Sequence, residues 1–246
     1  MHPIPRAAWI VYLAGVFLPI GVPATLLAAS VTWAGCRLGD HRKWGYYPGM
    51  LWSRLMVALT WCPCKVEGLE RLEPGRSYVL AANHTSAYDI FAIYGWVGRP
   101  FKWIMKKELR HLPVIGRACE EAGFIFVNRH GGKQALASLA EAEDRIRGGV
   151  SIAIFPEGSR TITGKTGDFK RGGFEIARDM HLPVVPISLS GNFRIMPRGA
   201  AYPIPHRMKM VIHPPVEFNP KTPEEEREMI ARVRQTVVSG IDPNYD

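Results

Sequence analysis

A histidine and an aspartate five residues apart are the first side chains in this chain that could do chemistry together. His84 and Asp89 lie between an apolar run, residues 78–82, that predicts a buried strand and a second run, residues 90–94, that predicts a helix. Ser86 fits the N-cap of that helix, with Asp89 three residues later as in a capping box. Asp89 can then reach the imidazole of His84, fix its tautomer and leave the other ring nitrogen free to take a proton. The spacing predicts a general base. For this motif alone, a helix cap beside an unreactive loop histidine is the alternative.

Cationic side chains follow several of the other predicted strands. After the strand at 151–155, Pro156 stops the strand and Gly158 permits a tight turn, so Glu157 and Arg160 stand at its carboxyl end. Ligands of open α/β sheets bind there, and an arginine can grip a phosphate with two hydrogen bonds. Arg129 and Lys106 occupy equivalent positions after two further strands. The pattern predicts a site for an anionic headgroup; a surface turn with a solvated arginine is the simpler alternative.

The net charge of +9 restricts the class of partner. It favours nucleic acid, an acidic membrane surface or a phosphorylated substrate. We expect no nucleic acid, because the cations recur at strand ends and no nucleic-acid-binding motif is visible. Four cysteines in 246 residues make no disulfide framework, and Cys62-Pro63-Cys64 has no matching Cys/His pair, so we expect no metal site.

The amino-terminal quarter of the chain has the composition of a membrane segment. Residues 7–36 contain no charged side chain, and about 20 apolar residues suffice to cross a bilayer. Pro19 and Pro23 are expected to kink this helix. A net basic turn, residues 37–43, leads to a second apolar stretch, residues 46–61, whose tryptophans and tyrosines suit the headgroup boundary.

These segments predict that residues 1–62 form a membrane-anchoring helical hairpin. A cleaved signal peptide and a pair of ordinary core helices are the alternatives. We expect the cell inner membrane or cytoplasmic membrane, with the active site and the rest of the protein facing the cytoplasm, because cations concentrate on that side.

Beyond Pro63, short strands alternate with helices. The predicted strands span residues 65–67, 78–82, 102–105, 124–127, 151–155, 184–190 and 208–213. The predicted helices span residues 87–97, 114–122, 133–147, 173–180 and 223–239, the last with Thr222 as its N-cap. This alternation predicts that residues 63–246 form one α/β domain, with a mostly parallel sheet flanked by helices.

Four motifs occur together in a known order. They are His84-x4-Asp89, residues 123–129, the block from Phe155 to Arg160, and Val185-Pro186-Ile187. The set resembles the four sequence blocks of the glycerolipid acyltransferases, and most closely those of the 1-acyl-sn-glycerol-3-phosphate (lysophosphatidate) acyltransferases. The resemblance covers approximately residues 63–215. Two positions depart from the pattern: Ser159 stands where the family often has Thr, and Asn128 where many members have Asp.

The resemblance implies transfer of a fatty acyl group from a thioester of coenzyme A or acyl carrier protein. The acceptor would be the free hydroxyl of lysophosphatidic acid, giving phosphatidic acid in phospholipid biosynthesis. His84 would be the general base, oriented by Asp89, and the hydroxyl would attack the thioester directly. No cofactor, metal or enzyme nucleophile is needed, so Ser86 would serve only as a cap.

The resemblance also assigns the acceptor site. Arg129 and Arg160, helped by Lys106, would hold the phosphate of the lysophospholipid, and Glu157 would position the acceptor or its arginine partners. Gly158 and Ser159 belong to the same substrate-binding block. Backbone amides near the start of the helix after His84 are expected to stabilise the tetrahedral oxyanion.

The four sequence blocks do not identify which acceptor is used. Glycerol 3-phosphate, a lyso-ornithine lipid or another lysophospholipid would suit the same residues. A protein of a different class, a non-catalytic membrane protein that binds anionic lipid, would explain the hairpin and the charge but would leave the His84/Asp89 pair as coincidence.

Overall fold

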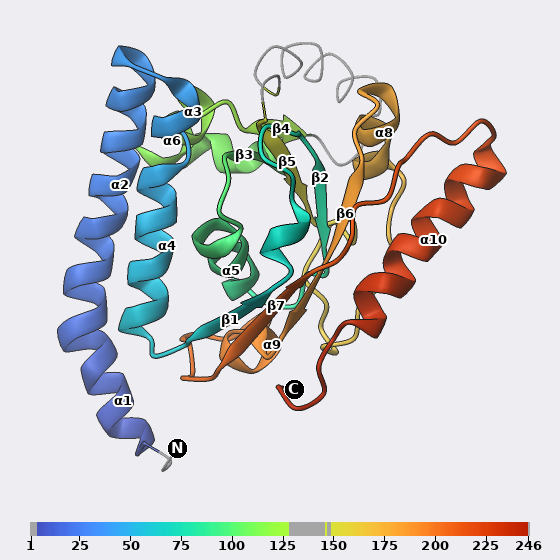
Figure 1. Ribbon diagram of the computed structural model, residues 1–246. Helices are drawn as coiled ribbons and strands as arrows, with labels where there is room; N and C mark the ends of the chain where they lie inside the picture. Colours follow the sequence, from blue (N-terminus) through green and yellow to red (C-terminus); the bar gives the residue numbers. More distant parts are fainter. Residues whose placement is uncertain (1–3, 128–145, 147–148, 246) are drawn as a thin grey trace.

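A seven-stranded sheet forms the centre of the protein in the computed structural model, which describes residues 4–127, 146 and 149–245 (Figure 1). Across the sheet the strands lie in the order β1-β7-β6-β2-β5-β3-β4. Their bounds are β1 Cys64–Glu67, β2 Val79–Ala82, β3 Phe101–Lys106, β4 Ile125–Val127, β5 Ser151–Ile154, β6 Val184–Ser190 and β7 Met208–Ile212. Strands β2 to β6 are mutually parallel, β7 pairs antiparallel with β6, and β1 pairs parallel with β7. The predicted mostly parallel α/β class is confirmed.

Helices cover both faces of the sheet, which explains why its central strands are apolar throughout. Strand β2 is fully buried along its whole length, as in parallel sheets that are covered on both sides. Helices α4 (Tyr47–Leu59) and α5 (Tyr88–Trp96) pack on one face, and α8 (Gly172–Asp179) and α10 (Pro223–Ser239) on the other (Figure 1). Within β2, Leu80 belongs to the first core and Val79 to the second, as strand alternation requires.

The remaining short elements lie in the connections. Helix α6 (Ile115–Glu121) follows the 3-10 helix η3 (Lys107–His111), and α9 (Asn192–Ile195) and the 3-10 helix η2 (Leu69–Arg71) are single turns. In the α/β part, the predicted bounds of strands and helices differ from the observed ones by at most one residue. The single-turn helix α9 and the 3-10 helices η2 and η3 were not predicted. The predicted helix at residues 133–147 lies outside the described residues apart from Ile146.

The amino-terminal segment is one long helix. Segments α1 (Arg6–Tyr12), η1 (Leu13–Phe17) and α2 (Leu18–Leu38) follow each other without a break, and the helix continues through Pro23. The π-helical turn η1 ends two residues before Pro19, where proline removes a backbone donor. The helix has 33 residues, a mean hydropathy of 2.1 in its most apolar window and only 11% of that window buried. It is long and apolar enough, by length and composition, to cross a membrane.

This helix and α4 lie side by side and are joined by the short helix α3 (His41–Trp44) (Figure 1). Near the N-terminus, Trp9 is buried and its Nε1 donates to the carbonyl of Pro203 at 2.7 Å. At the other end, Arg37 forms an ion pair with Glu121 at 2.9 Å. Part of the predicted basic turn is therefore helical, and its ion pair with Glu121 connects it to α6. That residues 1–62 act as a separate membrane anchor stays a prediction.

Candidate active site

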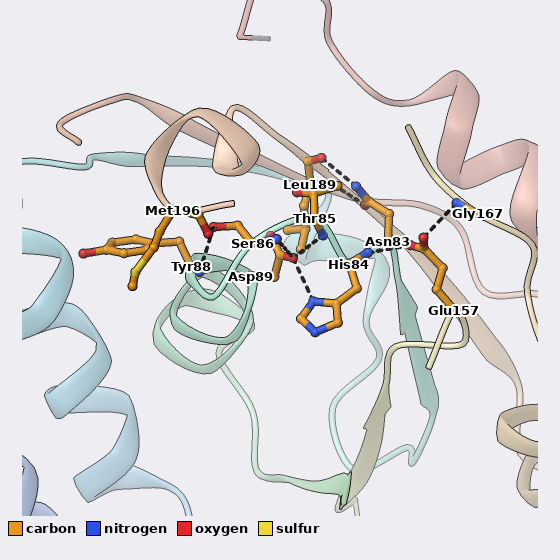
Figure 2. A network of polar contacts seen from close by, with 10 residues as sticks. All are labelled: Asn83, His84, Thr85, Ser86, Tyr88, Asp89, Glu157, Gly167, Leu189 and Met196. Atoms are coloured by element: carbon orange, nitrogen blue, oxygen red, sulfur yellow. Dashed lines mark hydrogen bonds and ion pairs between the residues drawn. The ribbon is translucent and has the colours of Figure 1, made fainter. Parts of the chain in front are cut away.

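The loop between β2 and α5 brings His84 and Asp89 into contact, as their spacing predicted (Figure 2). Asp89 is fully buried, and its Oδ2 accepts three hydrogen bonds. The donors are the backbone N–H of Thr85 at 2.6 Å, that of Ser86 at 2.7 Å and Nδ1 of His84 at 2.9 Å. The side chain of His84 keeps 15% of its surface exposed. One buried carboxylate thus shapes the loop and orients the imidazole.

This contact determines the tautomer of His84. An ionised carboxylate only accepts hydrogen bonds, so the proton shared between Asp89 and His84 resides on Nδ1. The other ring nitrogen, Nε2, is then the unprotonated one and can accept a proton from a ligand. The geometry is that of a general base with its orienting carboxylate.

The backbone N–H and carbonyl of His84 are both hydrogen-bonded to the segment that follows β5. Its N–H donates to Oε1 of Glu157 at 2.6 Å (Figure 2). Its carbonyl accepts from the N–H of Thr161 at 2.9 Å. The second oxygen of Glu157, Oε2, accepts from the N–H of Gly167 at 2.7 Å. Glu157 therefore links the histidine loop to the loop that follows β5. These contacts indicate a role in positioning His84, and contact of Glu157 with the acceptor stays a prediction.

An aromatic stack supports the imidazole ring. The rings of His84 and Phe155 lie 3.9 Å apart with an interplanar angle of 10°, and Trp103 stacks on Phe155 at 5.4 Å. Phe155 comes directly after β5 and Trp103 lies in β3, so two neighbouring strands carry the support. The ring of His84 is thus restricted by Asp89 at its edge and by Phe155 on its face.

Two hydrogen bonds between the side chain of Asn83 and the backbone of Leu189 fix the loop to the sheet. The side-chain amide of Asn83 donates to the carbonyl of Leu189 at 2.9 Å and accepts from the N–H of Leu189 at 2.8 Å. Asn83 is not among the site residues predicted from the sequence. A polar residue at the end of a fully apolar buried strand was the available signal, because a buried amide needs partners.

The amides at the start of α5 are already bonded within the protein. Those of residues 85 and 86 donate to Asp89, that of Ala87 donates to the carbonyl of Met196 at 3.3 Å, and that of Tyr88 donates to Oγ of Ser86 at 3.1 Å. These amides therefore have partners within the protein, and stabilisation of an oxyanion by amides near the start of this helix stays a prediction. The helix begins one residue later than expected, at Tyr88, and its N-cap is Ala87, so the prediction that Ser86 is the N-cap is wrong by one residue, although Oγ of Ser86 still accepts from the first amide of the helix.

The predicted phosphate-binding cations lie where the parallel strands end. Lys106 is exposed at the end of β3, and Arg160 is partly buried in the turn after β5. Within the described ranges, neither side chain forms a hydrogen bond or an ion pair. Gly158 has a φ of +74°, which confirms the tight turn, and Ser159 next to it is exposed. Arg129 lies outside the described residues.

Burial changes the electrostatics of several groups. It raises the pKa of Glu157, an effect opposed by the hydrogen bonds from the amides of Gly167 and His84. Burial also raises the pKa of the Cys64 thiol to about 12 and that of Cys62 above its usual value.

The sequence from residue 63 to residue 190, which contains every contact of His84 described above, matches the family described as Acyltransferase. The chain belongs to this acyltransferase family. The predicted resemblance is confirmed by relatives named 1-acyl-sn-glycerol-3-phosphate acyltransferase. One, from Pseudomonas aeruginosa, is 30% identical over 191 residues, which are 76% of this chain and 73% of that protein.

Two further members of the acyltransferase family extend the comparison. The chloroplastic 1-acyl-sn-glycerol-3-phosphate acyltransferase BAT2 of Brassica napus is 32% identical over 178 residues, and the chain spans only about half of it, 51%. The crystal structure of the 1-acyl-sn-glycerophosphate (LPA) acyltransferase PlsC from Thermotoga maritima matches with a TM-score of 0.79 at 26% identity. The structural match covers 96% of each chain, so the shared fold includes most of the N-terminal helices.

Proposed function

We propose that this protein is a 1-acylglycerol-3-phosphate O-acyltransferase. It transfers a fatty acyl group from a thioester of coenzyme A or acyl carrier protein to the free hydroxyl of lysophosphatidic acid. The product is phosphatidic acid, an intermediate of phospholipid biosynthesis. The observation that carries the proposal is the 2.9 Å contact between Nδ1 of His84 and Asp89 at the carboxyl end of a parallel sheet, in a member of the acyltransferase family.

In the proposed reaction, His84 is the general base. Its Nε2 takes the proton of the lysophospholipid hydroxyl as the oxygen attacks the thioester carbonyl. The tetrahedral intermediate then expels the thiolate, which takes up a proton from the imidazolium, so the enzyme returns to its starting state. Asp89, held by two backbone amides, stabilises the transient imidazolium through Nδ1.

The acceptor's phosphate is proposed to lie against the cations at the ends of the neighbouring strands. Arg160 contributes a bidentate contact, with Arg129 and Lys106 supplying further charge and the turn at Gly158 and Ser159 bringing the backbone close. Two facts about the described residues support this proposal for Arg160 and Lys106. Lys106 ends β3 and Arg160 follows β5, two strands parallel to β2, and neither side chain is neutralised by a carboxylate.

The membrane location is also part of the proposal. Residues 1–62 hold the enzyme at the inner or cytoplasmic membrane, with residues 63–246 on the cytoplasmic side, because the acceptor and the product are lipids. The support is the long apolar helix Arg6–Leu38 and its low burial. High salt should leave the protein in the membrane fraction and detergent should release it, since salt screens charges but does not weaken apolar burial. Release by salt alone would contradict the embedded helix.

The experiment that tests the activity is acyl transfer in detergent from a labelled acyl thioester. The donors are acyl-coenzyme A and acyl carrier protein, and the acceptors are lysophosphatidic acid, glycerol 3-phosphate, lysophosphatidylcholine and a lyso-ornithine lipid. The proposal predicts labelled phosphatidic acid as the main product. Transfer to another acceptor alone would correct the substrate, and no transfer from either donor would refute the proposal.

A further inference from the structure

A hollow of about 480 Å³ lies between the long N-terminal helix and the segment that joins β3 to α6. Trp33 of α2 forms one wall, and Leu112 and Val114 form the other. Arg110, His111 and Arg117 line the same hollow, and no carboxylate of the described residues does. It shares no lining residue with the candidate active site.

Among the described residues, one of the two arginines of the hollow has no ion pair and the other forms only an exposed one. In the part of the chain that the structure describes, neither His111 nor Arg117 has an ion pair or a side-chain hydrogen bond. Arg110 pairs with Glu120, and both side chains stay about half exposed, at 50% and 45%. An exposed pair of this kind adds little stability, so the arginine can turn toward a ligand at small cost.

The apolar walls are exposed beside these cations. Trp33, Leu112 and Val114 keep 38%, 43% and 42% of their surfaces accessible. Helix α2 continues this apolar surface with further exposed side chains, among them Leu27 at 66%. Apolar walls next to cations suit an amphipathic anion better than a free inorganic ion, and tryptophan is a typical residue of the headgroup boundary.

The wall formed by η3 and α6 is closely packed. The N–H of Gly116 donates to the carbonyl of Leu112 at 2.8 Å, and a Cβ at Gly116 would clash with the carbonyl oxygen of Arg110. Only glycine allows this approach. The backbone that carries the cations is therefore fixed before a ligand arrives, which lowers the cost of binding.

We propose that this hollow binds the headgroup of an anionic diacyl phospholipid of the surrounding bilayer. The phosphate lies against Arg110 and Arg117, and the first carbons of the acyl chains lie along Trp33, Leu112 and Val114. The site is separate from the proposed acceptor site, and it does not depend on the proposed reaction.

The test is a binding titration of the full-length protein in detergent. Dihexanoyl phosphatidylglycerol and dihexanoyl phosphatidylcholine are added below their critical micelle concentrations, and affinity is measured by calorimetry. We expect phosphatidylglycerol to bind at least ~10-fold more tightly, which corresponds to about 1.4 kcal/mol. Arg117→Gln alone should weaken that preference, and the pair Arg110→Gln and Arg117→Gln should abolish it.

Matched variants locate the effect. The pair Lys221→Gln and Arg232→Gln removes the same charge from exposed positions at α10 and should leave the preference unchanged. Arg160→Ala should also leave it unchanged; loss there would place the lipid at the proposed acceptor site and overturn the inference. Equal affinity for the two lipids, an unaltered preference in the double variant, or equally tight binding of inorganic phosphate would overturn it too. Because binding is the readout, these results are independent of whether lysophosphatidic acid is the substrate.

Discussion

The replacement Glu157→Gln tests the positioning role that the structure gives to this carboxylate. Its two oxygens accept from two backbone N–H groups, at 2.6 Å from His84 and 2.7 Å from Gly167. Glutamine has one carbonyl oxygen and one amide NH₂, so one of these N–H groups would face another donor and lose its partner. Glutamine also removes the charge from the hydrogen bond that remains.

The size of the effect follows from these contacts. A buried donor left unsatisfied costs about 1–3 kcal/mol, and part of this cost is offset because glutamine avoids burying a carboxylate. We therefore expect the free energy of unfolding to fall by about 2 kcal/mol. For a protein of 246 residues this corresponds to a Tm lower by roughly 4–8 °C. Displacement of the His84 backbone should lower kcat by about 10²-fold, the usual result of a misplacement near 1 Å.

The assay is acyl-transfer kinetics together with thermal unfolding of the same samples. Glu175→Gln is the matched control, because Glu175 is only partly buried and its contact with Arg171 is 3.8 Å long; it should change neither kcat nor Tm appreciably. If Glu157→Gln instead raised the KM for the acceptor while kcat and Tm stayed at wild-type values, Glu157 would contact substrate and the positioning role would be refuted.

Three further changes give distinct outcomes. Asp89→Asn should lower kcat by about 10²-fold or more, because an amide can donate to Nδ1 of His84 and stabilise the wrong tautomer; an unchanged kcat would contradict the assigned tautomer. Arg160→Ala should raise the KM for lysophosphatidic acid about 10–100-fold, because loss of a charged hydrogen bond costs ~1.5–3 kcal/mol. The KM for the acyl donor should change little, and Arg160→Lys should recover little of the lost affinity for the acceptor. His213, bonded to Ser188 at 2.7 Å, has its pKa lowered below 6.5 by burial and then by Arg71, so the unfolded chain binds a proton first as pH falls. The free energy of unfolding should therefore decrease as the pH drops from about 7 to 5, and His213→Gln should flatten that decrease in a series of thermal melts; an equal slope in both proteins would rule this explanation out.

Local patterns in the sequence predicted much of the fold. Apolar runs bounded by glycine, proline and polar residues located the strands, and Thr222 accepts a hydrogen bond from the amide of Glu225 at 3.1 Å, as its capping motif predicted. The contact between His84 and Asp89 was also predictable, since both lie within one loop and the first turn of its helix. Interactions of this range depend on few residues, so composition and spacing are enough to find them.

The contacts that connect distant segments could not be predicted in the same way. Glu157 bonds the amide of His84, 73 residues away, and the sequence does not reveal which of many amides a buried carboxylate will meet. The hydrogen bonds between Asn83 and Leu189 join residues 106 positions apart and depend on the order of β2 and β6 in the sheet. The stack of His84 on Phe155 likewise requires β2 and β5 to be neighbours.

The central claim is that His84 is the base for acyl transfer to lysophosphatidic acid. The most direct measurement compares initial rates of phosphatidic acid formation by the wild type and His84→Ala in the same detergent, with thermal melts to verify folding. The side chain of His84 makes one polar contact among the described residues, to Asp89, so the variant should fold normally. We predict a rate at least ~10²-fold lower at a similar Tm. A variant with a normal melt and a near wild-type rate would contradict the claim.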